Sequence, residues 1–400
     1  MKKVFLFICV MLLFSVSICA QKKVIAQART YLKSGKDFDK AEKLMTDLLK
    51  DSANRGNMKI RLLQFEAVKR QYEQGNEKLY LKQKYDTAAL FNSTYKMYHI
   101  LQEIDSLDVE PDKHGDIKPK YRAKHADFFN TYRPNLYNGG NFYTQKQDYS
   151  QAYRFYEAYL NCAELPLFED YEYLKNDSMM SRVAYGALYC GHKLRRPDIM
   201  LKYQELALKD TAHIDFVYQY LADMYQHEKD TANYVSTLLK GFEHNPSFPY
   251  FFPRLTDYYN RRGQMDAAMN IVNRALATDS LNAIYRFAKS TVLLNMGKYN
   301  ECITICKDLI AKNDSFADAY YNIGLAYFNQ AIELDKTSQH SRAINRKIRE
   351  LYEKSRPYME RYRALAPNRQ RKWIPVLYTI YLNLNMGEEF DEIDRLRTRR

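Results

Sequence analysis

The sequence predicts an all-α fold, an α-α superhelix or solenoid built from about eight helical hairpins. Glycine and proline are scarce, at 13 and 11 of 400 residues. All-β folds need turn residues about every eight to twelve positions, so this scarcity favours long helices joined by short turns. Gly263 and Gly297 stand 34 residues apart, and each is followed by a segment with helical periodicity. A fixed period of this length indicates a repeat array rather than one central core.

The first twenty residues predict a secretory signal peptide. Two lysines precede an apolar run, Val4–Val16, and a small residue precedes the expected cleavage after Ala20. Lipidation of Cys19 is an alternative that Ile18 disfavours, because the bacterial lipobox has a small residue just before its cysteine. An uncleaved anchor is another, although the run is short for a span of about 20 residues. We therefore expect a periplasmic protein, free or associated with the outer membrane, with no transmembrane span after signal removal.

The charge of the chain narrows the class of partner. The formal net charge of +13 becomes +11 once Lys2 and Lys3 leave with the signal peptide. Residues 341–400 hold 15 Lys and Arg against 8 Asp and Glu, so the basic character is concentrated at this end. For an exported protein this favours acidic protein, lipopolysaccharide or lipid headgroups, and we expect no nucleic-acid partner.

Four cysteines remain after signal removal. Cys302 and Cys306 are four residues apart, which on a helix places them on one face and predicts plain packing. No second cysteine pair or His-x3-His motif accompanies them, so a metal site is not expected. A disulfide between Cys162 and Cys190 is left open by the sequence.

Repeated segments are clearest in four units that begin at Asp215, Pro249, Ala283 and Ala317. The last unit reads Tyr320-x2-Ile323-Gly324-x2-Tyr327. This resembles the tetratricopeptide repeat (TPR) family, whose pattern is W-x2-L-G-x2-Y, then A-x3-F, then P. The chain looks like an exported bacterial member of that family. The resemblance implies antiparallel helix pairs in which small residues allow close approach, so we interpret these residues as packing positions rather than a ligand cage.

Six regions are expected along the chain. A signal peptide (1–20) is followed by irregular TPR-like hairpins (21–105), a loop or connection (106–132), further hairpins (133–214), four TPR units (215–369) and C-terminal capping helices (370–400). The connection is inferred from a stretch rich in Pro, Gly and charge. The last TPR unit contains about 19 extra residues, which predicts two helices that extend beyond their neighbours as a hairpin. Trp373, the only tryptophan, is expected in the capping pair.

Reactive constellations are not found in the sequence. Phosphate-binding glycine loops and a serine nucleophile elbow are absent, and His227 lacks the second histidine of a zinc protease. Asn138-Gly139-Gly140 resembles a phosphate loop only superficially, because Gly140 occupies the small site of a repeat. We therefore predict no enzyme activity, no catalytic residues, no cofactor and no metal.

The resemblance implies that a peptide or partner helix binds in a groove lined by the first helix of each repeat. The candidate groove residues are Gln219, Asp223, Gln226, Asp257, Asn260, Arg261, Asn295, Tyr321 and Asn329. A second candidate surface is a basic hairpin with Arg342, Arg346, Lys347 and Arg349. The clamp that some family members use for acidic chaperone tails is absent, because its positions hold Gln219, Asp223, Arg254, Ile284 and Ala288.

The predicted function is that of a non-catalytic periplasmic scaffold that binds a protein or peptide partner in the cell envelope. Two alternatives stay open at this point. One is binding of a glycan or envelope polymer, and the other is peripheral attachment to anionic lipid through the basic C-terminal region. The partner, the oligomeric state and the main contact surface are not specified by the sequence.

Overall fold

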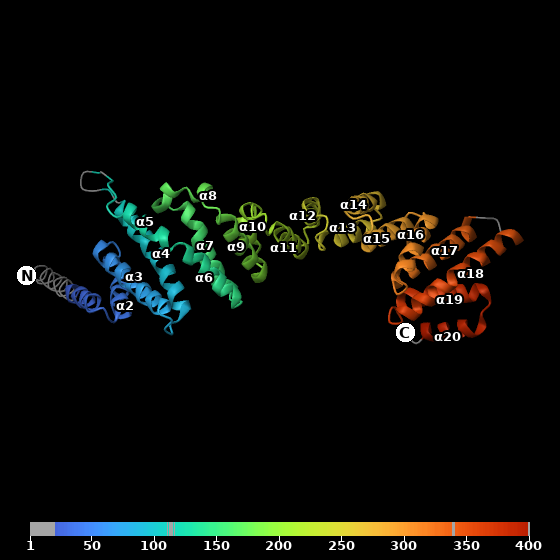
Figure 1. The fold of residues 1–400 in the computed structure, drawn as a ribbon, viewed down its shortest axis with the longest axis horizontal. Helices are drawn as coiled ribbons and strands as arrows, with labels where there is room; N and C mark the ends of the chain where they lie inside the picture. Colours follow the sequence, from blue (N-terminus) through green and yellow to red (C-terminus); the bar gives the residue numbers. More distant parts are fainter. Residues whose placement is uncertain (1–20, 110, 112–114, 116, 338–340, 399–400) are drawn as a thin grey trace, which may run out of the picture. The chain divides into compact units, whose positions relative to one another are not determined.

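The computed structural model describes residues 21–109, 111, 115, 117–337 and 341–398 (Figure 1). The predicted signal peptide lies outside the described residues. Helices joined by turns make up the described part of the chain, which contains no β-strand, and the all-α prediction is confirmed. None of the described helices combines the length and apolar character that a bilayer crossing needs. The contacts group into two compact units, Met1–Met224 and Tyr225–Arg400.

The first unit is a series of helical hairpins interrupted by irregular segments. Its helices are a segment at 21–34, α2 (Phe38–Leu49), α3 (Met58–Tyr80), α4 (Thr87–Asp108), α5 (Arg122–Tyr132), α6 (Pro134–Gln145), α7 (Tyr149–Asn161), α8 (Tyr173–Asn176), α9 (Met180–Leu194), α10 (Pro197–Ala207) and most of α11 (Ile214–His227). Three 3-10 turns, η1 (Ser52–Asn54), η2 (Cys162–Glu164) and η3 (Pro166–Tyr171), complete it. The antiparallel partners are consecutive helices, such as α3 with α4 and α6 with α7.

The predicted connection at 106–132 needs correction. Helix α4 continues to Asp108, and α5 fills the segment from Arg122 onward. The carboxylate of Asp108 accepts the backbone N–H groups of Tyr121 and Arg122, at 2.6 and 3.0 Å, so it satisfies donors where α5 begins. Arg122 also binds Asp105 of α4 through two hydrogen bonds, at 2.7 and 2.8 Å. The Pro and Gly residues that suggested a loop all lie before α5 begins.

The second unit contains the regular repeats. Its helices are the end of α11, then α12 (Thr231–His244), α13 (Phe251–Arg261), α14 (Met265–Thr278), α15 (Ala283–Asn295), α16 (Tyr299–Lys312), α17 (Ala317–Thr337), α18 (Arg342–Leu365), α19 (Gln370–Leu384) and α20 (Gly387–Thr398). Helices α12, α14 and α16 have 14 residues each. They begin at Thr231, Met265 and Tyr299, which are 34 residues apart, so the predicted period is present in the structure.

The turns before these three helices share one backbone conformation. Lys229, Gly263 and Gly297 have φ angles of 59°, 69° and 73°, and they also stand 34 residues apart. Glycine adopts a positive φ without a steric cost, which explains its place in two of the turns. Lys229 adopts the same conformation with a side chain, so the turn geometry is set by the hairpin and not by glycine alone.

Small residues allow the helices of a hairpin to approach closely, as predicted. A Cβ atom added to Gly324 would lie 2.5 Å from the Sδ atom of Met359. In the first unit, a Cβ on Gly140 would lie 2.3 Å from Cε1 of Tyr156, and one on Gly186 would lie 2.9 Å from its Cζ atom. Both distances are shorter than van der Waals contact. The Tyr156 ring therefore fills space that exists only because two neighbouring helices carry glycine there.

The last repeat has the predicted extension. Helices α17 and α18 have 21 and 24 residues, compared with 14 in α16, and they contact each other along their length. The tip of this hairpin, 338–340, lies outside the described residues. Trp373 of α19 is 2% exposed and packs in a core formed with α18 and α20. The expected capping pair is therefore α19 and α20.

All four cysteines of the described chain are free and buried. The disulfide between Cys162 and Cys190 that the sequence left open is not formed. The Cys162 thiol donates instead to the carbonyl oxygen of Ala158, one turn earlier on α7, at 3.2 Å. Burial raises the pKa of Cys162 and of Cys190 to about 12, so both are protonated at neutral pH. Cys302 and Cys306 lie in an apolar core, in agreement with the packing interpretation.

Candidate functional site

The second unit brings three of the predicted groove residues together around one cavity of about 440 Å³. These are Gln226, Asp257 and Arg261. The cavity, called here the α13 cavity, lies among the end of α11, the turn after it, the start of α12 and one face of α13. Its lining consists of Tyr225, Gln226, Lys229, Thr231, Tyr234, Arg254, Asp257, Tyr258, Arg261 and Arg262. Four cationic side chains and three tyrosines therefore surround a single carboxylate.

Helix α13 presents its part of the lining because of helical spacing. Arg254, Asp257, Tyr258 and Arg261 follow one another at i, i+3, i+4 and i+7, which places them on the same face of the helix. Nε of Arg261 forms an ion pair with Oδ1 of Asp257 at 2.9 Å, and both side chains are more than half exposed. The only carboxylate of the lining therefore has a cationic hydrogen-bond partner and is still exposed to solvent.

Aromatic rings hold two guanidinium groups of the α13 cavity in place. The Arg254 guanidinium carbon lies 3.6 Å from the ring centroid of Tyr250, and its Nη1 donates to the Tyr250 carbonyl oxygen at 3.1 Å. The Arg262 guanidinium carbon lies 4.7 Å from the ring centroid of Tyr258. A guanidinium that stacks on a ring still directs N–H donors outward in its own plane. This planar arrangement matches the two oxygens of a carboxylate.

The turn between α11 and α12 supplies the remaining cation. Lys229 is exposed and has its positive φ because the turn folds back, with the Asp230 N–H donating to the Tyr225 carbonyl at 2.9 Å. The Asp230 carboxylate caps α12 by accepting the Asn233 N–H at 3.1 Å, and this bonding lowers the Asp230 pKa. The Tyr225 pKa is raised, chiefly by burial, so its phenol stays neutral.

The other predicted groove residues lie elsewhere. Asn295 of α15 donates through Nδ2 to Oδ1 of Asn260 on α13 at 3.2 Å, so these two amides form a second polar contact in the same unit. Tyr321 is half-buried, with its ring 4.8 Å from that of Tyr362. Burial raises its pKa to about 12, which is the behaviour of a packing residue. Asn329 is half-buried on α17.

Gln219 and Asp223 belong to the part of α11 in the first unit, where both are half-buried. Both lie on the same helix as Gln226 of the α13 cavity, seven and three residues before it.

The four residues of the basic hairpin lie on the first turns of α18 and are exposed. Arg346 and Arg349 pair with Glu350 and Glu353, four residues later, at 3.6 and 3.4 Å. Arg342 and Lys347 have no ion-pair partner within the described part of the chain. Exposed pairs of this kind contribute little to stability, so the positive charge is available for contacts with an anionic surface.

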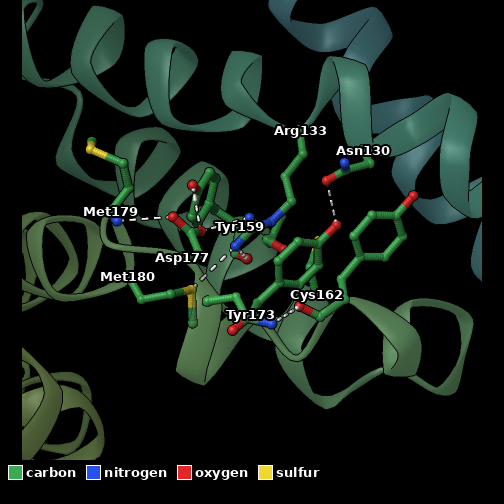
Figure 2. Close-up of polar contacts among 11 residues, drawn as sticks. Asn130, Arg133, Tyr159, Cys162, Tyr173, Asp177, Met179 and Met180 are labelled. Atoms are coloured by element: carbon green, nitrogen blue, oxygen red, sulfur yellow. Dashed lines mark hydrogen bonds and ion pairs between the residues drawn. The ribbon is translucent and has the colours of Figure 1, made fainter.

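A buried ion pair in the first unit was not predicted from the sequence (Figure 2). Arg133 has a side chain only 5% exposed, and its Nη1 binds Oδ2 of Asp177 at 2.7 Å. Its guanidinium carbon lies 3.7 Å from the ring centroid of Tyr159 and 3.6 Å from that of Tyr173. The Tyr159 hydroxyl donates to the same Asp177 oxygen at 2.8 Å.

Arg133, which lies between α5 and α6, connects these helices to the irregular segment between α7 and α9. Nη2 of Arg133 contacts the Tyr159 carbonyl oxygen at 3.3 Å and Sδ of Met180 at 3.2 Å. The Asp177 carboxylate also accepts the Met179 N–H at 2.9 Å, at the start of α9. The Arg133 side chain is almost completely buried among these groups, so its role is to hold the η2–η3–α8 segment in place. Among the described residues, no group of three or more His, Cys, Asp or Glu could hold a metal ion.

The repeat features of the structure fit one architecture. They are the 34-residue period, the turns with positive φ, the close helix contacts at small residues and the terminal capping pair. The chain is TPR-like. No family model matches its sequence, and no curated protein sequence matches it.

Solved TPR structures are similar to this TPR-like chain at low sequence identity. The C-terminal part of a TPR repeat-containing protein from Cytophaga hutchinsonii has a TM-score of 0.42 and 10% identity, over 64% of this chain and 92% of that one. The P58(IPK) TPR domain has a TM-score of 0.26 and 12% identity, over 95% and 100%. Yeast Tom70 has a TM-score of 0.28 and 11% identity, over 94% and 88%.

Proposed function

We propose that the chain is a non-catalytic TPR-like scaffold that binds a protein or peptide partner in the cell envelope. The observation that supports this most directly is the α13 cavity. Its volume of about 440 Å³ is in the range of ligand sites, about 300 to 1,000 Å³, and aromatic, cationic and polar side chains converge on it. Tyrosine and arginine are enriched among the residues that dominate binding energy at protein interfaces.

The location in the periplasm rests on the N-terminal sequence. The basic start, the apolar run and the small residue Ala20 support export and cleavage before Gln21. The mass of the protein recovered from the periplasmic fraction tests this directly. A mature chain that begins at Gln21 is expected in this fraction. A full-length chain in the cytoplasm would contradict the periplasmic location, and the partner of the α13 cavity would then be a cytoplasmic protein.

Site-specific photo-crosslinking in the native cells tests the scaffold. A photoreactive amino acid replaces Gln226 in the α13 cavity, and a matched copy carries it at Lys240, which is exposed on α12. We expect one envelope protein to crosslink from Gln226 and not from Lys240. The crosslink should weaken when Arg261→Glu removes a cation from the same lining. Equal crosslinking from both positions, or recovery of the bare chain alone, would contradict a binding site at this cavity.

Attachment to anionic lipid is a second candidate, supported by Arg342 and Lys347 on α18, which are exposed and have no ion-pair partner among the described residues. Vesicles of phosphatidylglycerol in phosphatidylcholine should then bind the wild type, and binding should fall when both residues are changed to glutamate. A double variant that binds these vesicles as well as the wild type does would exclude this surface. For glycan binding, no described contact gives comparable support.

A further inference from the structure

We propose that the α13 cavity binds an acidic peptide segment, with the side-chain carboxylates of the peptide held by Lys229, Arg254 and Arg262. This inference rests on the proposed function and specifies the chemistry of the partner. Lys229 and Arg262 lie outside the groove that the sequence predicts. Arg254 occupies a position of the chaperone-tail clamp that this chain lacks.

The lining of the α13 cavity carries an excess of positive charge. Asp257 is the only carboxylate in it, and Arg261 already pairs with Asp257 at 2.9 Å. Lys229, Arg254 and Arg262 have no ion-pair partner within the described part of the chain. Three cations of one sign in one cavity repel each other, and an anionic ligand would relieve this repulsion. Carboxylates are the anions that a peptide supplies most readily.

Two guanidinium groups of the lining are already oriented before a ligand arrives. Tyr250 lies under Arg254, and Tyr258 lies under Arg262, at 3.6 and 4.7 Å from guanidinium carbon to ring centroid. Stacking restricts the rotation of each side chain, so less conformational entropy is lost when a carboxylate binds. The Tyr258 ring, which lines the cavity, also provides apolar surface for the methylene groups of a Glu or Asp side chain.

The lining favours a peptide over a sulfated glycan or a phospholipid headgroup. Such polyanions offer mainly acceptors, so they would leave the acceptor groups of the lining without donors. A peptide backbone offers both N–H donors and carbonyl acceptors, and Gln226, Thr231 and Asp257 provide acceptors for its N–H groups. An acidic peptide therefore uses the whole lining, whereas a polyanion uses only its cations.

The polar contact between Asn260 and Asn295 indicates how a peptide could continue past the cavity. Asn260 lies beside Arg261 on α13, and its Oδ1 accepts from Asn295 Nδ2 on α15 at 3.2 Å. Each amide has a further donor or acceptor group, because a primary amide has two N–H donors and a carbonyl. Side-chain amides on successive first helices of the repeats can bond an extended backbone, so the peptide would run from α13 toward α15.

Fluorescence anisotropy with two designed peptides tests the proposal. One labelled peptide alternates Glu and Ala, and its counterpart alternates Gln and Ala. The test variant carries Lys229→Glu and Arg262→Glu, both at exposed positions. The matched control carries Arg346→Glu and Lys347→Glu on α18, which changes the net charge by the same amount. Circular dichroism checks the fold of both, and Arg262→Gln replaces the double variant if that variant does not fold.

We expect the wild type to bind the Glu peptide about tenfold or more tightly than the Gln peptide, because each charge-assisted hydrogen bond contributes about that factor. The test variant should lose about tenfold or more, and the control variant should bind like the wild type. No binding of the Glu peptide at low salt, equal binding of both peptides, or equal losses in the two variants would overturn the proposal. Stronger competition by heparin or by phosphatidylglycerol vesicles would assign the cations to a polymer or a lipid instead.

The crosslinking experiment separates this inference from the proposed function. If the Gln226 crosslink to one envelope protein persists while the Glu peptide does not bind, the scaffold stands and the acidic chemistry is wrong. If both fail, the α13 cavity is not a partner site.

Discussion

Replacing Arg133 by methionine should destabilise the first unit by about 3 to 5 kcal/mol, which is the typical cost of removing one partner of a buried ion pair. Methionine keeps an apolar stem of similar length but leaves Asp177, only 15% exposed, without its cation. The Tyr159 hydroxyl and the Met179 N–H still donate to this carboxylate, which places the loss within that range rather than above it. The two stacked rings also lose a desolvated cation, worth about 2 kcal/mol each in isolation but not additive here.

Native-state hydrogen exchange measures this loss locally, because a repeat array need not unfold in one step. Amides of 159–180 should exchange faster in the variant. Trp373 lies in the second unit, so its fluorescence should report an unchanged transition there. The matched control is Arg274→Met, since Arg274 also pairs with a carboxylate, Glu243 at 3.6 Å, but the two side chains are 40% and 59% exposed. That change should cost less than about 1 kcal/mol. A similarly small cost for Arg133→Met would refute the reasoning.

Three further predictions concern packing, thiols and pH. Gly140→Ala should cost about 1 to 3 kcal/mol of unfolding free energy, because its Cβ would lie 2.3 Å from the Tyr156 ring, whereas Gly56→Ala, with nothing within 4 Å, should cost far less. In the native chain the four described cysteines should not react with a thiol reagent at neutral pH. In a chain that begins at Gln21, denaturant should expose four thiols, and fewer would reveal a disulfide. Burial lowers the His125 pKa below its ordinary 6.5, so the unfolded chain binds more protons and stability should fall as pH drops through 6.5 to the folded pKa. In His125→Phe this fall, followed by chemical denaturation at each pH, should be smaller, and an unchanged pH profile would contradict the assignment.

The architecture was predictable from the sequence because packing requirements repeat. Gly324 has to be small where Met359 lies against its helix, and the same requirement recurs at Gly140, where the Tyr156 ring lies against the helix. The start of α5 could not be read from composition, since the Asp108 carboxylate that accepts its first N–H groups is local in space but thirteen residues away in sequence. The Arg133 cluster was missed for the same reason. Its partner Asp177 lies 44 residues further on, and no periodicity links the two.

The α13 cavity was predicted only in part. Asp257 and Arg261 follow from helical spacing, and the same spacing could have identified Arg254 and Tyr258. Lys229 could not be found in this way, because it reaches the cavity through a turn with positive φ in a position where the repeat elsewhere has glycine.

The two faces of α13 show why a TPR-like sequence predicts its fold better than its ligand. Phe252, Leu255 and Thr256 are buried, and the repeat fixes their size because neighbouring helices pack against them. Arg254 and Asp257 alternate with these residues on the same helix but are half-buried or exposed, so packing leaves their chemistry unconstrained. Substitutions on the packed face should therefore change stability first, and substitutions on the cavity face should change binding with little change in stability. Because the repeat constrains only the first face, the identity of the partner is encoded in the second.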